Sequence, residues 1–150
     1  MRLARCPFLD QGEGATRAEL LALARAADDV ARGEQSFLIY PEGHRSRDGR
    51  LQPFMPRGSR LVLERARDRP VYLVVVDGLW HLRTLADIAF RLAGSSARAV
   101  VLGPFAVPGE NSEVGPFVEF LRERMAEALA SLRLPATENA PLAARPHPAA

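Results

Sequence analysis

The sequence feature that most constrains the fold is an apolar run, Val71–Val76, which lies between Pro70 and the pair Asp77-Gly78. A short apolar run that is bounded by turn-forming residues is typical of a strand buried on both faces. Such a strand needs a sheet that helices cover. The rest of the chain must therefore supply the neighbouring strands and those helices.

The segments on either side of this strand alternate between helical and extended patterns. A capping-box signature at Thr16–Glu19 opens a helix that is rich in alanine and leucine and stops before Gly33. Further helices are predicted at 59–67, 81–92 and 112–132, and further strands at 3–9, 36–40 and 97–102. This alternation predicts an α/β domain with a mostly parallel sheet flanked by helices. The domain is expected to span residues 1–134, with a disordered, proline- and alanine-rich tail at 135–150.

The composition limits the class of protein. With 47% apolar residues, the chain of 150 residues can bury a core as one domain. No apolar run reaches the roughly 18 residues of a membrane span, and no secretory signal follows Met1. The single Cys6 cannot form an internal disulfide. These features predict a cytoplasmic protein, with peripheral contact at the inner face of a membrane left open.

All fixed positive charge on the side chains is arginine, because the chain has no lysine. The planar arginine fork suits phosphate, since it donates two parallel hydrogen bonds to paired oxygens. The net charge of +2 is too small to suggest a general nucleic-acid binder. No nucleic-acid partner is therefore expected.

A polar stretch, Tyr40–Arg47, follows the strand predicted at 36–40. In open α/β sheets ligands bind beyond the carboxyl ends of strands, so this stretch is the candidate site. Gly43 would let backbone amides approach a ligand closely, and Glu42 can orient an arginine or accept a hydrogen bond from a hydroxyl. The arginines of the stretch can clamp an anion. The same residues also suit a surface turn with an ion pair, and composition alone leaves both interpretations open.

This stretch resembles the Phe-Pro-Glu-Gly-Thr-Arg-Ser block of the glycerophospholipid acyltransferases. The best known members are the lysophosphatidic acid (1-acylglycerol-3-phosphate) acyltransferases. Neighbouring blocks occur in the family's order, and the match covers most of the chain from Phe8 to Leu132. These blocks are Phe8–Gln11 (Phe-Ile-Asp-Arg in the family), Leu51–Gly58 (Leu-x-Pro-Phe-Lys-x-Gly), Val71–Val76 (Val-Pro-Ile-Val-Pro-Val) and Val100–Pro104, a strand that ends in Gly-Pro.

The resemblance implies a partial glycerolipid-acyltransferase-like fold and an enzyme of phospholipid synthesis. Such an enzyme transfers a fatty acyl group from acyl-CoA or acyl carrier protein to the hydroxyl of a lysophosphatidic acid-like acceptor. The acyl donor is a co-substrate, and no cofactor or metal is expected. Glu42, Gly43 and Arg45 would bind the phosphate of the acceptor. The full set of implied substrate-binding residues is Glu42, Gly43, Arg45, Arg47, Arg57 and Gly58.

The sequence also departs from the family. His44 and Gln11 replace the family's Thr and Arg, and one more residue separates Phe54 from Gly58. Arg57 could replace the charge of the family's lysine, with a different reach and geometry. Family members carry a His-x-x-x-x-Asp motif ahead of these blocks, and the resemblance assigns its His as the general base on the acceptor hydroxyl. That motif is absent from this sequence, so no catalytic residue is predicted.

Two pairs come near the missing spacing. His44 and Asp48 are one residue too close, and His81 and Asp87 are one residue too far apart. Three alternatives to an active enzyme therefore stay open. The chain is a truncated, non-catalytic member that binds phosphorylated lipid, a sequence whose true start lies upstream, or a binding module of another class, such as an arginine-rich nucleic-acid binder or a phosphate-lipid sensor.

Overall fold

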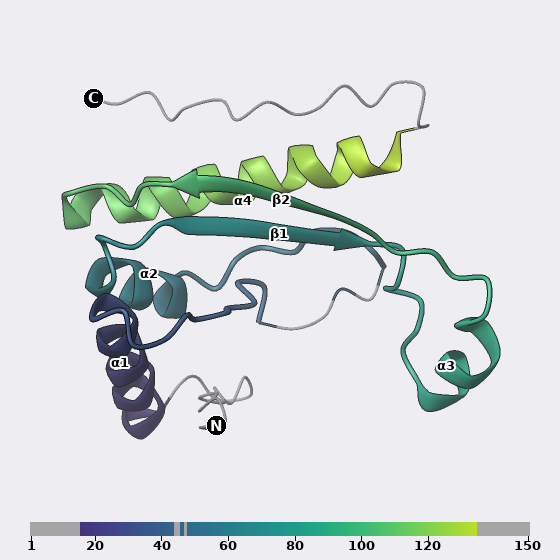
Figure 1. The fold of residues 1–150 in the computed structure, drawn as a ribbon, viewed down its shortest axis with the longest axis horizontal. Coiled ribbons are helices and arrows are strands. Elements are labelled where there is room, and N and C mark those ends of the chain that lie inside the picture. Colours follow the sequence, from purple (N-terminus) through teal and green to yellow (C-terminus); the bar gives the residue numbers. More distant parts are fainter. Residues whose placement is uncertain (1–15, 44–45, 47, 135–150) are drawn as a thin grey trace.

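The structure is a computed structural model that describes residues 16–43, 46 and 48–134. Its elements follow one another as α1 (Arg17–Ala31), α2 (Pro56–Arg65), β1 (Val71–Asp77), α3 (Leu85–Arg91), β2 (Arg98–Phe105) and α4 (Asn111–Arg133). The two strands lie side by side, and α4 runs along them (Figure 1). Helices α1 and α2 lie at one end of the strands, and α3 stands beyond the other end.

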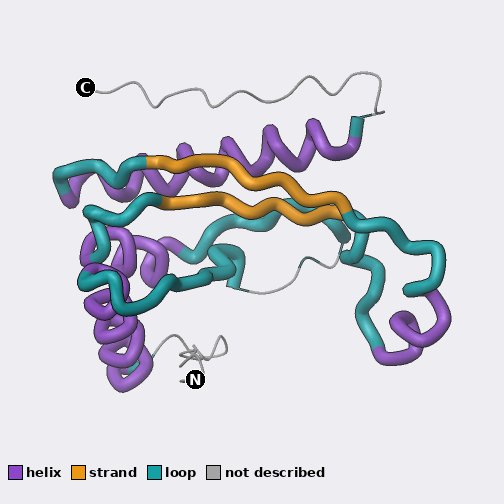
Figure 2. The backbone as a smooth tube through the Cα atoms, in the orientation of Figure 1, coloured by secondary structure: helices purple, strands orange, loops and turns teal. Residues whose placement is uncertain are grey.

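The two strands pair antiparallel, with Leu73 opposite Leu102 and Val75 opposite Val100. The part of the chain that the structure describes contains no other strand (Figure 2). The predicted mostly parallel sheet flanked by helices is therefore wrong. A parallel pair needs an intervening helix that packs across the sheet. Helix α3 packs against none of the other described elements, so the chain returns beside β1 in the opposite direction.

The main core lies between one face of the sheet and α4. Leu73, Val75, Leu102 and Phe105 point from the sheet toward Phe117, Leu121 and Ala128 of α4. The apolar residues of α4 recur at three- and four-residue steps, which puts them on one side of the helix. Phe117 is only 1% exposed. The helix predicted at 112–132 is thus confirmed, although it begins at Asn111 and no side chain caps its start.

A second, smaller cluster joins α1 to α2. Leu23 and Ala27 of α1 meet Val62 of α2, and Phe37 packs against them. The capping box at the start of α1 is confirmed, because Glu19 N–H donates to Thr16 Oγ1 (3.3 Å) and Thr16 N–H donates to Glu19 Oε2 (2.7 Å). The sequence pattern placed this helix correctly because the local hydrogen bonds decide where it begins.

Other predicted boundaries differ from the structure. Residues 36–40 form no strand, and the side chains of Leu38 and Tyr40 are 71% and 72% exposed. Helix α2 starts at Pro56 rather than at residue 59, because proline suits the first helical turn. Strand β2 continues past Gly103-Pro104 to Phe105. The two-stranded sheet makes β2 an edge strand, where proline is tolerated. The strand predicted at 3–9 and the tail at 135–150 lie outside the described residues.

None of the described helices covers the opposite face of the sheet, so the expectation that 71–76 is buried on both faces is wrong for the described residues. Tyr72, Val74 and Val76 of β1 and Val101 of β2 alternate with the core residues and are between 48% and 62% exposed. None of the described helices combines the length and the apolar character that crossing a membrane requires.

Candidate functional site

Two hydrogen bonds, one between backbone groups and one from a backbone amide to a side chain, hold the loop after Tyr40 to the segment that leads into α2. Met55 N–H donates to Pro41 O (2.7 Å), and Gln52 N–H donates to the Glu42 carboxylate at Oε2 (2.6 Å). Residues 41–42 and 52–55 are therefore fixed relative to each other. Glu42 uses one oxygen as a brace, and no described residue donates to its other oxygen, Oε1.

Gly43 forms a tight turn in this loop. Its φ of 73° lies in the left-handed region, which glycine adopts without the steric cost that a Cβ adds. Its N–H donates to Tyr40 O (2.9 Å). Because that amide is already used inside the turn, it is less available to a ligand than the sequence reasoning assumed.

The first turn of α2 lies next to this loop. Pro56 occupies the start of the helix, and no side chain caps it at Met55. Arg57 is exposed and Gly58 is half-buried. The first N–H groups of a helix have no partner within it and carry partial positive charge, which favours an anion. An arginine on the same turn strengthens that preference.

The structure thus brings four of the six predicted site residues into one region. Glu42 and Gly43 belong to the loop, Arg57 and Gly58 belong to α2, and the Met55–Pro41 hydrogen bond joins the two segments. The other two, Arg45 and Arg47, lie outside the described residues, as does His44.

Asp48 organises the following turn. Its Oδ1 accepts hydrogen bonds from Arg50 N–H (3.0 Å) and Ser46 Oγ (3.2 Å). The amide of Arg50, followed by the hydroxyl of Ser46, lowers the pKa of Asp48 below its ordinary value. The carboxylate is therefore a structural acceptor in the turn.

The next residue, Gly49, packs its backbone against the ring of Trp80. A Cβ built on Gly49 would lie 2.9 Å from Trp80 Nε1, and the φ of 76° also favours glycine. The carbonyl of Gly49 accepts a hydrogen bond from Arg133 at the end of α4. The candidate loop is consequently anchored at its far end by contacts that no sequence motif indicated.

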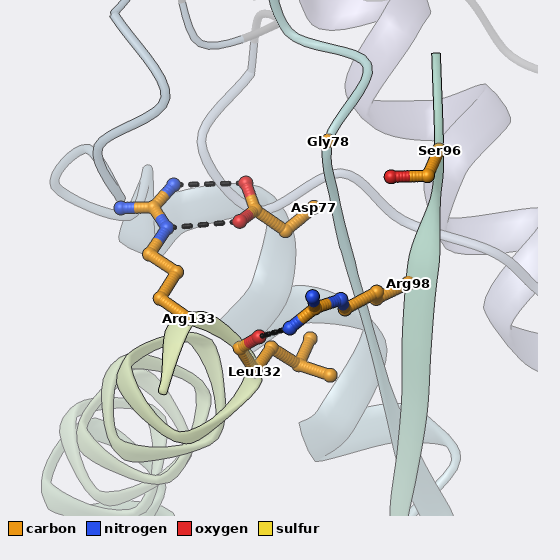
Figure 3. A pocket seen from close by; sticks show the side chains of 6 residues that line it. All are labelled: Asp77, Gly78, Ser96, Arg98, Leu132 and Arg133. Carbon is orange, nitrogen blue, oxygen red and sulfur yellow. Dashed lines mark hydrogen bonds and ion pairs between the residues drawn. The ribbon is translucent and has the colours of Figure 1, made fainter. Parts of the chain in front are cut away.

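Arg133 links the far end of this loop to the end of β1. Its Nε and Nη2 donate to Asp77 Oδ2 and Oδ1, each at 2.9 Å, in the two-pronged geometry of Figure 3. These hydrogen bonds lower the pKa of Asp77 below its ordinary value and raise the pKa of Arg133 above its own. The pair joins the end of β1, the end of α4 and the candidate loop.

An open hollow of about 270 Å³ lies beside the pair. Its lining residues are Asp77, Gly78, Ser96, Arg98, Leu132 and Arg133. Arg98 reaches across it and donates from Nη1 to Leu132 O (2.7 Å). The charged side chains of the hollow, Asp77, Arg98 and Arg133, are thus already engaged with residues of its own lining, and we interpret it as a structural junction.

Sequence reasoning missed this junction, although one signal was present. Asp77 is a carboxylate directly at the end of the clearest strand, which is a place where function or a structural ion pair is common. The sequence pattern indicates only that Asp77 and Gly78 end the strand in a turn. Its partner Arg133 is 56 residues away, and no local pattern connects the two.

The two near-miss pairs do not supply a catalytic dyad among the described residues. His81 Nε2 lies 3.2 Å from Ser95 Oγ. Asp87 instead caps α3, where it accepts from Thr84 N–H (3.0 Å) and Thr84 Oγ1 (2.9 Å). The Thr84 hydroxyl, followed by the Thr84 and Arg83 amides, lowers the pKa of Asp87. In the other pair, Asp48 is occupied as above and His44 is not described.

The described residues hold no group of three or more His, Cys, Asp and Glu side chains that could bind a metal ion. Comparisons with protein-family models, with curated proteins and with solved structures found no match to this chain. The acyltransferase resemblance therefore rests on the order and content of its sequence blocks.

Proposed function

We propose that this chain is an acyltransferase-family protein whose loop and α2 start bind the phosphate of a lysophosphatidic acid-like acceptor. The observation that carries the proposal is the Met55–Pro41 hydrogen bond of 2.7 Å, which holds the Pro-Glu-Gly block beside the uncapped start of α2. An anion there would meet helix N–H groups and the guanidinium of Arg57.

The reaction would be acyl transfer at a membrane surface in phospholipid synthesis. The acceptor hydroxyl attacks the thioester carbonyl of acyl-CoA or acyl carrier protein, a C–O bond forms, the C–S bond breaks, and the thiol leaves with the proton. A general base speeds such a step by roughly a hundred- to ten-thousand-fold. The described residues offer no base in a dyad, so acceptor binding is the better supported half of the proposal.

Binding and turnover should be measured separately. Isothermal titration with lysophosphatidic acid tests the phosphate site, and the matching monoacylglycerol, which lacks the phosphate, serves as the control ligand. Arg57→Ala should weaken binding of lysophosphatidic acid by about 1.5 kcal/mol, roughly tenfold, because one charged hydrogen bond is lost. Equal affinity for the two ligands would refute a phosphate site.

Arg60→Ala is the matched control, since Arg60 also lies on α2 but pairs with Glu64 (3.4 Å). It should leave the affinity for lysophosphatidic acid unchanged within about twofold, because an exposed ion pair contributes little. If both variants lost the same affinity, general positive charge on α2 and not the helix start would bind the lipid.

Turnover is followed as transfer of a radiolabelled acyl group from acyl-CoA to lysophosphatidic acid. Product formation would support an enzyme. Binding of lysophosphatidic acid without product would support the alternative, a non-catalytic member that binds phosphorylated lipid. The nucleic-acid alternative has no supporting observation among the described residues. Two exposed arginines of α2, Arg60 and Arg65, pair with Glu64 and Asp28.

A further inference from the structure

The segment between the two strands, residues 79–96, projects from the body of the molecule and is called the arm here. It contains α3 and stands beyond the strand ends, away from α1, α2 and α4 (Figure 1). Helix α3 packs against none of the other described elements and buries none of its residues. The arm is thus the region in which the apolar residues of this chain contribute least to its core.

The arm nevertheless has a defined local structure. A capping box starts α3, because Asp87 N–H donates to Thr84 Oγ1 (3.0 Å) and Thr84 N–H donates to Asp87 (3.0 Å). The two ends of the arm meet where His81 Nε2 lies 3.2 Å from Ser95 Oγ. Leu82 is buried at the base. The other apolar side chains of the arm therefore point outward from a segment whose local hydrogen bonds are formed.

Those outward side chains are large and strongly exposed. Leu85 and Phe90 are 86% and 85% exposed, and Ile88 and Leu92 are 45% and 52% exposed. At roughly 100° per residue, the apolar positions of the helix cover an arc of about 200°. The pair Asp87 and Arg91 occupies the other side of the helix and is joined at 3.5 Å.

Positive charge borders the apolar arc. Arg83 and Arg91 are exposed, and Asp87 is the one carboxylate between Gly78 and the start of β2. That carboxylate is engaged by Thr84 and Arg91. No described residue pairs with the guanidinium of Arg83 through its side chain. An apolar patch edged by free arginine is complementary to a lipid surface with anionic phosphates.

The shape of the patch favours lipid over a protein groove. A groove receives one stripe of a helix, whereas Leu85 and Phe90 diverge by about 140° around α3. Fluid hydrocarbon adapts to side chains that point in different directions. Trp80, which is 45% exposed at the start of the arm, adds the kind of ring that concentrates at membrane interfaces.

We propose that the arm is a peripheral membrane anchor, which inserts Leu85, Ile88 and Phe90 into an anionic lipid surface. This inference rests on the proposed function, because an enzyme or binding protein for a lipid acceptor meets that acceptor at a membrane. Trp80 packs on Gly49 of the candidate loop. The anchor would therefore hold the acceptor site close to the lipid.

The first test is co-sedimentation of the full chain with vesicles of phosphatidylcholine and phosphatidylglycerol that contain no lysophosphatidic acid. The protein should sediment with the vesicles. Leu85→Ser and Phe90→Ser should each lower the affinity roughly 10- to 100-fold, because each removes a large side chain from hydrocarbon. The matched control is Leu21→Ser on α1, where Leu21 is 52% exposed, and it should bind like the parent chain.

The charge requirement is tested with Arg83→Gln and its control Arg25→Gln, an exposed position on α1. Arg83→Gln should weaken binding to the anionic vesicles by about fivefold, as expected for one arginine near such a surface. Binding to pure phosphatidylcholine should be equal for both variants. Equal losses on anionic vesicles would mean that net charge alone acts, and this result would contradict the proposal.

Trp80 provides a direct readout, because it is the single tryptophan of the chain. Its fluorescence should shift to shorter wavelength on the vesicles, and brominated lipid should quench it. Absence of sedimentation, or sedimentation that survives Leu85→Ser and Phe90→Ser, would overturn the proposal. A concentration-dependent dimer that these variants abolish, without vesicle binding, would do so too and would assign the arm to a second copy. Leu85→Ser should leave the titrated affinity for lysophosphatidic acid unchanged, which separates failure of the anchor from failure of the acceptor site.

Discussion

Two apolar regions of this molecule are built from the same residue types and end in opposite environments. Phe117 of α4 is 1% exposed between the helix and the sheet, whereas Phe90 of α3 is 85% exposed on the arm. Helix α4 spans 23 residues, so its apolar side can follow the strands, while α3 spans seven. A short helix that contacts no other element cannot bury its apolar side. Apolar residues alone therefore do not show that a helix is buried. The helix must also be long enough and have neighbouring elements to pack against.

The largest expected effect tests this contrast directly. Phe117→Ala should lower the free energy of unfolding by about 3–5 kcal/mol, since it leaves a cavity in the packed core. Phe90→Ala should change that free energy by less than about 0.5 kcal/mol, because the ring is already in solvent. Urea unfolding followed by circular dichroism measures both. A comparable loss in the two variants would mean that the arm packs against the body.

The junction between sheet and arm gives the next largest effect. Gly78 has a φ of 100°, and a Cβ there would lie 2.1 Å from Ser96 O. Gly78→Ala should lower the free energy of unfolding by about 2–3 kcal/mol, through backbone strain and the clash.

Gly94→Ala is the control for Gly78→Ala. Gly94 has a similar φ of 89°, but a Cβ there would meet nothing within 4 Å. It should lose only about 1 kcal/mol, from strain alone. Thermal unfolding of both variants measures the difference, and equal losses would indicate that the two ends of the arm are not in close contact.

The parts of the fold that sequence predicted correctly are those decided by local chemistry. Thr16 and Glu19 fix the start of α1 by hydrogen bonds three residues apart, and the run at 71–76 is apolar enough to specify β1. The predicted parallel direction of the strands was wrong because it assumed that the helix between them packs across the sheet. Helix α3 makes no such contact, and its own sequence pattern does not show this. The strand predicted at 36–40 failed for a similar reason, because an apolar pattern does not supply a hydrogen-bonding neighbour.

The candidate site divides in the same way. Glu42, Gly43, Arg57 and Gly58 are close in sequence and meet through one hydrogen bond between Pro41 and Met55. Arg133 was out of reach of sequence reasoning, because its contacts to Asp77 and Gly49 join residues 56 and 84 positions away. Only the packing of α4 along the sheet brings them together.

The Asp77–Arg133 pair ties the packed half of the molecule to the loop, and its effect depends on pH. Hydrogen bonds from Arg133 lower the pKa of Asp77 in the folded state. The stabilisation is therefore complete above the unfolded value of about 3.9 and is lost as pH falls through the lower folded pKa. Asp77→Asn should cost about 1 kcal/mol at neutral pH, a modest value because Arg133 is 41% exposed.

Urea unfolding of the parent chain and of Asp77→Asn at several pH values checks this. The difference between them should persist at pH 5. It should shrink below about pH 3.9, where Asp77 gains its proton first in the unfolded chain and then, at lower pH, in the folded one. The exposed Asp68 provides the control, and Asp68→Asn should change stability by less than about 0.5 kcal/mol. A difference that grows in acid would show that the pair does not stabilise the fold.

The smallest expected effect concerns a charge inside the packed half. Arg124 of α4 is 7% exposed, and its Nε has no hydrogen-bond partner among the described residues. Its Nη1 donates to Glu127, whose side chain is 56% exposed. Arg124→Met would remove an incompletely satisfied buried charge and leave Glu127 in solvent. The free energy of unfolding should stay equal or rise by up to about 1 kcal/mol.

Urea unfolding compares Arg124→Met with Arg122→Met, which removes the half-buried partner of Glu119 at 2.9 Å on the same helix. The control should change stability by less than about 0.5 kcal/mol, as for other exposed ion pairs. A loss of more than about 2 kcal/mol in Arg124→Met would mean that the buried guanidinium holds the helix in place. In that case the core would depend on a buried charge. The comparison between an apolar core and an arm with exposed apolar side chains would then need revision.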